Sequence, residues 1–494
     1  MNLAEIVETH PGSATALRQG SASTTYGELR ERSAALCSAL SASGVGEADR
    51  VVLLLPTTPA FVAAYLAVLG TGAIAVPLNP TSPEAEIQAE ARAVRPVLGL
   101  VGDPDPEKLR AVLGGVDVEA LTVDELVAVA TGEAPIRQMG ESDPAVFLFT
   151  SGTAGTPKPA ILTHGSLMAN IDQLGCRAGL APTAEDTGVL VVPPFHVFGL
   201  NAVLGLHLAS GGRLVLAERF DPRTLLETLR TEKVTVLAGV PQVFAALAEV
   251  KEARADDLAS LRLACSGAAP LDLETAERFE ARFGVRVWQG YGLTEASPAV
   301  TFPDLSGEWR PESIGVPLPG VEVTLVDPDG AEVEPGDPGE MLVRGPNVFA
   351  GYFEDEVATA AVIDAGGRLH TGDIAVMDDD GSFRIVDRAK DLVIVSGFNV
   401  FPAEVEQVLV QHPAVKDAAV VGMADPEHGE VVQAFVVPAE SAWPEGEASP
   451  EISASEIADF CAAYLARYKC PAVVRFVRVL PRGSGGKVLR RALA

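Results

Sequence analysis

The sequence predicts an α/β protein with a large N-terminal domain and a smaller C-terminal α+β domain. Three observations predict this fold. Short apolar runs alternate with helical patterns through roughly the first 300 residues. After about residue 310, alternating patterns around turn residues predict a small antiparallel β region. From about residue 389, short strands and helices mix within one compact segment. Hydrophobic residues make up 48% of the 494 residues, enough for extensive cores.

A long uncharged stretch, residues 51–80, is long enough for a membrane span. Proline and glycine residues divide it into short pieces. These pieces are typical of a strand at 51–55, a helix at 59–70 and a second strand at 73–78. We therefore predict a βαβ unit inside a parallel sheet that is buried on both faces, and no integral membrane association.

The same alternation continues along the chain, and each short apolar run is typical of a buried strand. These strands are predicted at residues 146–149, 188–192, 213–217, 235–239, 261–265 and 285–288. The clearest helical patterns lie at 221–233 and 270–283. Residues 321–345 alternate around an Asp-Gly turn and predict the antiparallel β region. The final segment has strand patterns at 392–395, 418–423 and 433–439 and helical patterns at 402–411 and 455–468. The domains are predicted as 1–388 and 389–494.

Charge and cysteine content limit the classes of partner and compartment. The formal net charge is -30, from 67 acidic and 37 basic residues, which argues against binding to nucleic acid. An anionic ligand would therefore need a few local positive groups. The five cysteines show no metal-ligand spacing and indicate a reduced, cytoplasmic compartment. The first residues lack a basic segment followed by an apolar one, so no signal peptide is expected.

A small-residue loop follows the strand predicted at 146–149 and reads FTSGTAGTPKPAILTHGS. Gly152 and Gly155 allow the backbone to approach a ligand closely, and several hydroxyl groups lie between them and Lys158. Backbone N–H groups, hydroxyls and one lysine suit phosphate oxygens. The loop does not match the Walker pattern, and its residues alone leave a mobile surface turn as an equal alternative.

Three further stretches carry candidate chemistry. In QGYGLTEASP, an aromatic residue between glycines suits stacking on a base, and Glu295 suits a hard cation, although the stretch also suits a turn packed on the core. Asp373 can accept hydrogen bonds from ribose hydroxyls, and Arg388 can donate a fork of hydrogen bonds to sugar or phosphate oxygens. In LPRGSGGKVLRRAL, Lys487 ends a glycine-rich run.

Taken together and in this order, these stretches resemble the adenylate-forming superfamily, which includes acyl-CoA synthetases, adenylation domains of peptide synthetases and firefly luciferase. The resemblance extends from about Tyr26 to about Leu493, and the ordered set is far more specific than any single motif. It implies a two-step reaction in which a carboxylate attacks the α-phosphate of ATP and a thiol, normally that of coenzyme A, then attacks the acyl-AMP. ATP and coenzyme A are the implied co-substrates and Mg²⁺ the implied cofactor.

The resemblance also implies roles for individual residues in the nucleotide site. The residues implied to hold the phosphates of ATP are Thr150, Ser151, Gly152, Thr153, Thr156 and Lys158. Those implied to pass along the adenine are Gly267, Ala268, Ala269, Gly290, Tyr291 and Gly292. The resemblance implies that Thr294 contacts the α-phosphate, Glu295 ligates Mg²⁺, and Asp373 and Arg388 bind the ribose. Lys487 would bridge the carboxylate and the α-phosphate during adenylation.

Further implied roles concern the acyl group and the second step. His196 and Phe198 fit an aromatic gate between the nucleotide and the acyl group, with His196 taking part in catalysis. The implied acyl pocket comprises His196, Phe198, Gly199, Val240 and Gly267. Lys390 falls at the hinge about which the C-terminal domain would rotate between steps. The implied binding segment for coenzyme A is Ser396, Gly397, Phe398 and Asn399.

Two positions depart from the family pattern. Ala154 stands where a threonine is common, and Pro159 follows the lysine where a glycine is usual. The first change removes a hydroxyl, and the second removes an N–H group and stiffens the exit of the loop. We expect an active enzyme whose ATP affinity is modestly weakened.

The residues near the predicted aromatic gate limit the class of acid that the protein can bind. The segment after the gate carries no aspartate to pair an amino group, and the likely pocket segments are neutral and apolar. A hydrophobic monocarboxylate is therefore expected, with a fatty-acyl-CoA synthetase as the leading interpretation. An aryl-acid CoA ligase, an acyl-AMP ligase that loads a carrier protein, and a non-catalytic relative remain alternatives. The sequence leaves the oligomeric state open between monomer and homodimer.

Overall fold

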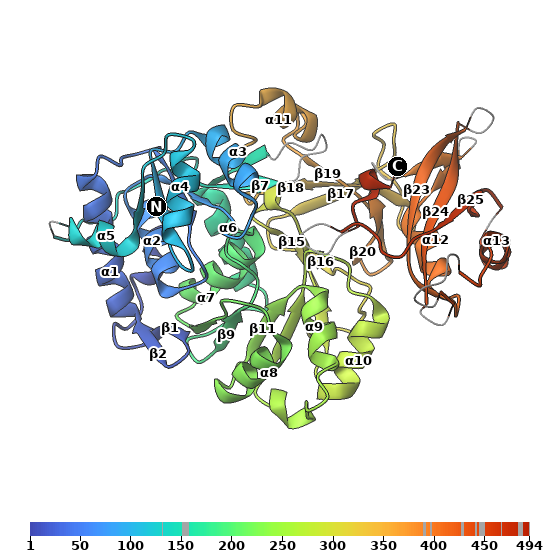
Figure 1. Cartoon of the computed structure of the whole chain (residues 1–494), viewed down its shortest axis with the longest axis horizontal. Coiled ribbons are helices and arrows are strands. Elements are labelled where there is room, and N and C mark those ends of the chain that lie inside the picture. Colours follow the sequence, from blue (N-terminus) through green and yellow to red (C-terminus); the bar gives the residue numbers. More distant parts are fainter. Residues whose placement is uncertain are drawn as a thin grey trace. The chain divides into compact units, whose positions relative to one another are not determined.

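The computed structural model describes residues 1–130, 132–150, 158–388, 392–395, 398–425, 429–439, 442–443, 450–465, 467–482 and 488–493. The chain forms two compact units, shown along the sequence in Figure 1. The first comprises Met1–Val323 with Val343–His370, and the second comprises Thr324–Leu342 with Thr371–Ala494. The predicted α/β fold, with a smaller α+β part at the C-terminal end, is confirmed. Lys390, the predicted hinge residue, lies outside the described residues, and the domain boundary at 388/389 stays a prediction.

The first sheet of the N-terminal unit has six strands in the order β6-β5-β3-β4-β7-β8. Its strands are β3 (Arg50–Leu54), β4 (Ile74–Pro77), β5 (Leu98–Val101), β6 (Ala120–Thr122), β7 (Pro144–Thr150) and β8 (Lys158–Thr163). The nearby helices are α1 (Tyr26–Ala42), α2 (Pro59–Gly70), α3 (Glu84–Val94), α4 (Pro106–Gly114) and α5 (Val123–Ala128). All neighbouring strands are parallel except β7 and β8, which form an antiparallel hairpin.

The predicted βαβ unit is confirmed, because α2 connects the parallel strands β3 and β4. The Thr58 hydroxyl caps the helix by accepting the Phe61 N–H at 3.3 Å, and Pro59 supplies its first turn. Nearly every residue of α2 is buried, which explains the absence of charge in this stretch. Among the described helices, none combines the length and apolarity that a membrane crossing requires.

The second sheet of this unit has seven strands in the order β13-β12-β11-β9-β10-β1-β2. Its strands are β1 (Thr15–Gln19), β2 (Ala22–Thr25), β9 (Thr187–Leu190), β10 (Arg213–Leu216), β11 (Val236–Gly239), β12 (Leu263–Ser266) and β13 (Val287–Gln289). The helices are α6 (His164–Gly175), α7 (Leu206–Ala209), α8 (Pro222–Thr231), α9 (Pro241–Ala248) and α10 (Leu273–Phe283). Only the β1–β2 hairpin is antiparallel.

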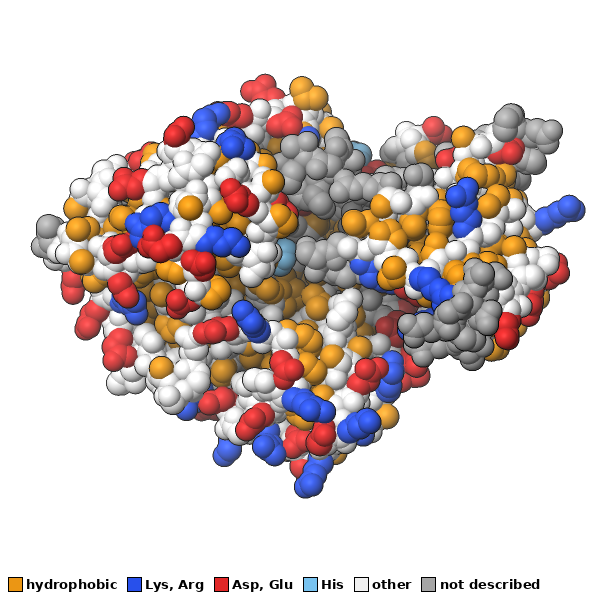
Figure 2. Space-filling model, viewed as in Figure 1, with side chains coloured by type: hydrophobic (Ala, Val, Ile, Leu, Met, Phe, Trp, Pro, Cys, Tyr) orange, Lys and Arg blue, Asp and Glu red, His pale blue; other side chains and the backbone are white. Residues whose placement is uncertain are grey.

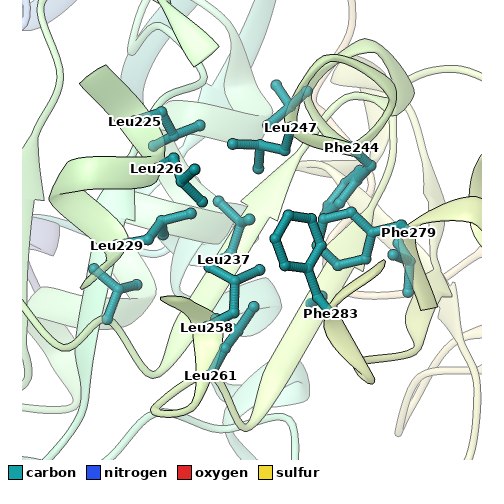
Figure 3. Close-up of a cluster of buried hydrophobic side chains, with 14 of the residues drawn as sticks. Leu225, Leu226, Leu229, Leu237, Phe244, Leu247, Leu258, Leu261, Phe279 and Phe283 are labelled. Carbon is teal, nitrogen blue, oxygen red and sulfur yellow. The ribbon is translucent and has the colours of Figure 1, made fainter. Parts of the chain in front are cut away.

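A buried apolar cluster joins α8, α9 and α10 to β11 (Figure 3). Leu237 of β11 lies at its centre and is fully buried. Leu226 and Leu229 approach it from α8, and Phe244 and Phe279 meet edge to face with ring centres 5.3 Å apart. This cluster makes the sheet a rigid base for the loops at its carboxyl edge.

Short elements complete the N-terminal unit. They are the 3₁₀ helices η1 (Leu3–Val7), η3 (Ala255–Leu258) and η4 (Thr294–Ala296), the π-helix η2 (Phe198–Gly205), and α11 (Glu356–Val362). A three-stranded sheet comprises β14 (Tyr291–Gly292), β15 (Ala299–Phe302) and β16 (Val316–Pro317). On the face seen in Figure 2, acidic and basic side chains are interspersed over α8–α10. Arg223–Glu252 and Arg278–Glu249 are ion pairs of this surface.

The remaining strands form two further sheets. One has the order β17-β18-β19-β20, with β17 (Glu322–Val326), β18 (Pro338–Arg344), β19 (Leu369–Met377) and β20 (Phe383–Arg388). The other contains β21 (Val393–Val395), β22 (Phe398–Val400), β23 (Val415–Asp425), β24 (Gly429–Pro438) and β25 (Val473–Phe476). Its helices are α12 (Pro402–Leu409), α13 (Ala454–Ala462), η6 (Arg467–Lys469) and η7 (Arg490–Ala492).

The β region at 321–345 differs in one detail from its prediction. The Asp-Gly turn is present, with Gly330 at φ +84° and its N–H bonded to the Asp327 carbonyl at 3.0 Å. The stretch after the turn forms only a single bridge, between Val326 and Glu332, and the next strand begins at Pro338. Alternating hydrophobicity alone does not reveal where strand pairing stops.

Candidate active site

Four adjacent parallel strands of the seven-stranded sheet end beside one another, in the order β13-β12-β11-β9. Ligands of open parallel α/β sheets bind outside these carboxyl ends. His196 follows β9, Val240 follows β11, Gly267 follows β12 and Gly290 follows β13. The fold therefore brings together, at one edge, the residues that the sequence assigned to the acyl pocket and the adenine.

Two residues predicted to line the acyl pocket, Phe198 and Gly199, lie on the π-helix η2, which begins at Phe198. π-Helical turns are rare and occur frequently at functional sites. A Cβ atom added to Gly267 would lie 3.5 Å from the Phe198 ring, so the ring faces the end of β12 across a gap that a methyl group would fill. A Cβ atom at Gly199 would lie 2.3 Å from the Val192 carbonyl oxygen, which only glycine avoids. The Val240 side chain packs against the buried cluster beneath the edge.

His196 has an exposed ring surface, and it stacks obliquely on Phe195 with ring centres 4.8 Å apart. Desolvation by the surrounding protein nevertheless lowers the pKa of His196. A ring that is both accessible and desolvated suits the wall of an apolar recess. The lowered pKa favours the uncharged imidazole at neutral pH.

The turn after β13 needs its glycines for space. A Cβ atom on Gly292 would lie 2.1 Å from the Pro298 carbonyl oxygen, and one on Gly290 would lie 2.8 Å from the Phe302 ring. Ala268, at the neighbouring strand end, has a left-handed backbone with φ +67°. Tight backbone packing therefore fixes both segments predicted to pass along the adenine.

Three buried asparagines hold the turn that carries Thr294 and Glu295. Asn347 donates to the carbonyls of Ala296 and Ala299 at 2.9 and 3.0 Å. Asn201 of η2 donates to the Ser297 carbonyl at 2.8 Å, and Asn170 of α6 donates to the Ala299 carbonyl at 2.8 Å. All three side chains are at most 1% exposed. No sequence pattern identified these asparagines, although for Asn170 and Asn201 a polar residue inside an apolar helical run was a usable signal.

The loop predicted to bind phosphate connects β7 and β8, whose end residues Thr150 and Lys158 are direct partners. The loop residues Ser151, Gly152, Thr153 and Thr156 lie outside the described residues, so their roles stay predictions. Lys158 Nζ lies 3.0 Å from Asp355 Oδ2 and 5.6 Å from the centre of the Tyr352 ring. The Pro159 carbonyl accepts the Phe353 N–H at 2.9 Å, so the proline is tied to the 349–355 segment.

Tyr352 connects this loop to the predicted metal ligand. Its hydroxyl donates to Glu295 Oε1 at 2.7 Å, and the Thr150 hydroxyl also interacts with the phenol. Burial and then the nearby Glu295 carboxylate raise the pKa of Tyr352, so the phenol keeps its proton and acts as a donor. Tyr352 and Asp355 could not be identified from the sequence, because no local pattern connects them to Glu295 and Lys158, which lie 57 and 197 positions away.

The residues around Glu295 fit a magnesium ion that arrives with ATP. The described part of the chain has no cluster of three or more His, Cys, Asp or Glu side chains that could hold a metal alone. Mg²⁺ in nucleotide sites usually takes one or two carboxylates together with phosphate oxygens and water. Glu295 supplies one carboxylate, and the Thr150 hydroxyl and Lys158 lie on the same side through their contacts with Tyr352.

The predicted ribose residues lie in the second unit, where Asp373 of β19 and Arg388 of β20 are direct partners on antiparallel strands. The Asp373 side chain is 5% exposed. Phe398 and Asn399 lie in β22 opposite Val395 and Ile394. Lys390, Ser396, Gly397 and Lys487 lie outside the described residues, so their predicted roles are untested.

Comparison with known families identifies the chain. Residues 3–353 match the model of the AMP-binding enzyme family, and residues 404–487 match that of the AMP-binding enzyme C-terminal domain. The chain belongs to the AMP-binding enzyme family. The resemblance drawn from the motifs is thereby confirmed, and the protein is an ATP-dependent, AMP-forming CoA ligase.

Several curated relatives cover almost the whole ligase. A feruloyl-CoA synthase of Amycolatopsis sp is 38% identical over 97% of this chain and 94% of its own length. A 4-coumarate–CoA ligase 2 of Oryza sativa subsp. japonica is 36% identical, with 95% and 87% covered. A long-chain-fatty-acid–CoA ligase of Escherichia coli O157:H7 is 33% identical, with 95% and 89% covered.

Solved structures agree with this assignment. The ATP-bound MatB of Rhodopseudomonas palustris superposes on the ligase with a TM-score of 0.91 at 29% identity, covering 100% of this chain and 98% of its own. The o-succinylbenzoate CoA synthetase of Bacillus subtilis, in complex with its acyl-adenylate intermediate, gives a TM-score of 0.87 at 31% identity, covering 99% and 97%. Both ligase units therefore have counterparts in enzymes solved with nucleotide.

Proposed function

We propose that the ligase activates an aromatic carboxylic acid of the hydroxycinnamate type and transfers it to coenzyme A. The observation that carries this proposal is its full-length similarity to a feruloyl-CoA synthase and a 4-coumarate–CoA ligase. The sequence alone favoured a fatty acid with an aryl acid as an alternative, and these relatives favour that alternative. A long-chain fatty acid remains the second candidate, because a fatty-acid ligase is 33% identical over a similar length.

The geometry of the acyl side supports a flat substrate. The Phe198 ring faces Gly267 across a gap that a methyl group would fill, and Gly199 lies against backbone, so an aromatic ring and glycines line this side. Aromatic rings prefer offset-stacked or edge-to-face contacts with such a wall. The neutral His196 ring adds a second aromatic surface without placing a charge beside an apolar acid.

In the first step, an oxygen of the substrate carboxylate attacks the α-phosphorus of ATP, and the bond to the bridging oxygen of pyrophosphate breaks. In this proposal, Lys158 and Thr150, which pair directly across the β7–β8 hairpin, hold the departing phosphates. Mg²⁺ held by Glu295 would neutralise phosphate charge. In the second step, the sulfur of coenzyme A attacks the acyl carbon and AMP leaves with the bonding electrons. Most of the acceleration then comes from positioning and charge neutralisation.

A pyrophosphate-exchange assay across a panel of acids tests the substrate class. The panel comprises ferulate, 4-coumarate, benzoate, octanoate and palmitate, each with Mg-ATP. We expect kcat/KM for the two hydroxycinnamates to exceed that for either fatty acid by up to about tenfold, since aromatic contacts add about 0.5–1.5 kcal/mol beyond the area that they bury. A preference for palmitate or octanoate would transfer the assignment to the second candidate.

The acceptor and the site residues are tested by separating the two half-reactions. Product formation is compared with coenzyme A and with a purified holo carrier protein, and we expect coenzyme A to be preferred. For Lys487→Ala, we expect pyrophosphate exchange to collapse while thioester formation from supplied acyl-AMP largely survives. Equal loss of both half-reactions would contradict the proposed role of Lys487 and the rotation of the C-terminal domain.

A further inference from the structure

The Tyr352 hydroxyl forms a hydrogen bond with one of the two carboxylate oxygens of Glu295, the predicted metal ligand. The phenol donates to Glu295 Oε1 at 2.7 Å. Within the described part of the chain, no hydrogen bond reaches Oε2 of the same carboxylate. A carboxylate with one oxygen engaged in this way offers a single free oxygen to a cation. The phenol therefore controls how many Glu295 oxygens are available, which is a different task from filling space.

The backbone holds this phenol firmly. The segment that carries Tyr352 pairs with β8: the Ala350 N–H donates to the Ile161 carbonyl at 3.0 Å, and the Phe353 N–H donates to the Pro159 carbonyl at 2.9 Å. The Phe349 N–H donates to the Glu295 carbonyl at 2.9 Å. The same short segment thus binds both the backbone and the side chain of Glu295. Motion of the phenol relative to the carboxylate is restricted from both ends.

The ring of Tyr352 is also fixed on its faces and edges. Phe349 meets it in a T-shaped contact with ring centres 5.0 Å apart. The ammonium group of Lys158 lies 5.6 Å from the ring centre and is held there by Asp355 at 3.0 Å. Asp355 is itself fixed, because its other oxygen accepts the Ala358 N–H at 2.8 Å as the cap of α11. The phosphate lysine and the metal carboxylate are therefore placed by one residue between them.

We propose that Tyr352 is a positioning residue that makes Glu295 a one-oxygen ligand and thereby favours Mg²⁺ over larger cations in the ATP site. Mg²⁺ requires near-ideal octahedral geometry, which a carboxylate bound through one oxygen allows. Ca²⁺ accepts carboxylates bound through two oxygens in irregular geometry. Removing the phenol hydroxyl frees Oε1, so it weakens the site for Mg²⁺ more than for Ca²⁺. This inference rests on the proposed role of Glu295 as metal ligand.

The test is Tyr352→Phe, which keeps the ring, its contact with Phe349 and its position beneath Lys158. The matched control is Tyr26→Phe: Tyr26 is fully buried in the same unit, and its hydroxyl donates to the Gly212 carbonyl at 2.9 Å. Binding of α,β-methylene-ATP, which cannot form an adenylate, is measured by calorimetry without metal, with Mg²⁺ and with Ca²⁺. Pyrophosphate exchange is then measured against Mg²⁺ concentration with the preferred acid.

For Tyr352→Phe we expect the apparent Mg²⁺ affinity to fall by about tenfold, the usual effect of removing a group that orients a metal ligand. We expect the Ca²⁺ affinity to fall less, and metal-free binding of the analogue to stay unchanged. Tyr26→Phe should leave all three affinities at wild-type values. Equal losses for both metals, or no loss for either, would overturn the proposal.

Failure of this proposal and failure of the proposed function give different results. The calorimetric experiment needs no acid substrate, so it does not depend on which acid is activated. A wild-type chain that binds the analogue no better with Mg²⁺ than without it would overturn both the nucleotide site and the role of Tyr352. A wild-type response to Mg²⁺ that Tyr352→Phe retains in full would reject the role of Tyr352 alone.

Discussion

The three buried asparagines that hold the turn bearing Glu295, namely Asn170, Asn201 and Asn347, are called here the asparagine clamp. Replacing Asn347 by leucine should separate the contribution of this clamp to catalysis from its contribution to stability. The side chain is fully buried and donates to the carbonyls of Ala296 and Ala299. The Ala299 carbonyl keeps its bond from Asn170 at 2.8 Å, whereas no other described donor reaches the Ala296 carbonyl. Leucine would therefore leave one buried carbonyl without a partner.

The loss in the free energy of unfolding can be worked out from the two hydrogen bonds that leucine would remove. One orphaned buried carbonyl costs about 1–3 kcal/mol, and the lost bond to Ala299 costs about 1 kcal/mol. We expect Asn347→Leu to lower the free energy of unfolding by about 2–4 kcal/mol. Because the turn bearing Glu295 is then loosened, we also expect the apparent Mg²⁺ affinity in pyrophosphate exchange to fall by about tenfold or more.

Asn2 provides a matched control. It is also fully buried, and its amide donates to the carbonyls of Leu69 and Arg137 at 2.7 and 2.9 Å, away from the site. Asn2→Leu additionally removes the cap of η1, so its cost in stability should be at least as large. Its effect on Mg²⁺ affinity and on the exchange rate of the folded enzyme should be negligible.

Urea unfolding followed by tryptophan fluorescence measures the stability of the relevant unit. Trp288 and Trp309 belong to the N-terminal unit and Trp443 to the other, so a Trp443→Phe background reports the first unit alone. If Asn347→Leu and Asn2→Leu lose Mg²⁺ affinity to the same extent, the effect comes from general destabilisation, and the clamp has no specific role in holding Glu295.

Three further predictions concern titration and packing in the N-terminal unit. Burial lowers the pKa of His164 and of His207 to about 4, so each removes up to about 3 kcal/mol of stability as the pH falls from about 6.5 toward 4. Urea midpoints of His164→Asn and His207→Asn should therefore decrease less with acid than those of the wild type. Burial, and then Glu86, raise the pKa of Glu90 to about 7, so stability is lost as the pH rises through that value. Glu90→Gln should raise the free energy of unfolding at pH 8 by about 1–2 kcal/mol and by less at pH 5. Gly292→Ala places a methyl group 2.1 Å from a backbone carbonyl, so pyrophosphate exchange should fall at least about a hundredfold, while binding of coenzyme A measured by calorimetry is retained.

The elements that were predicted best from the sequence are those bounded by proline or glycine residues. The helix at 59–70 was predicted with its observed bounds, because Pro59 starts the helical pattern and Gly70 ends it. The π-helix of η2 could not be distinguished from an ordinary helix, since both bury the same apolar residues. The β region at 321–345 was placed correctly, but its second strand began later than the turn suggested.

The site shows the same division between local and long-range information. Motifs located the strand ends that carry His196, Gly267 and Gly290, because each lies directly after an apolar strand. Tyr352 and Asp355 were not predicted as site residues. Their partners are distant in sequence, and a tyrosine or an aspartate in a loop shows no characteristic spacing. One sequence shows which residues can do chemistry more readily than which residues hold them in place.

The asparagine clamp and Tyr352 act on the same carboxylate from different sides. The clamp fixes the backbone on which Glu295 stands, through Asn347 and its two companions, whereas the phenol fixes the side chain at Oε1. If only their joint action aligns the remaining oxygen with the metal, loss of either one already releases it. The double variant Asn347→Leu with Tyr352→Phe should then lose little more Mg²⁺ affinity than the worse single variant. Additive losses would instead mean that clamp and phenol stabilise the site independently, and that the carboxylate has more than one productive position.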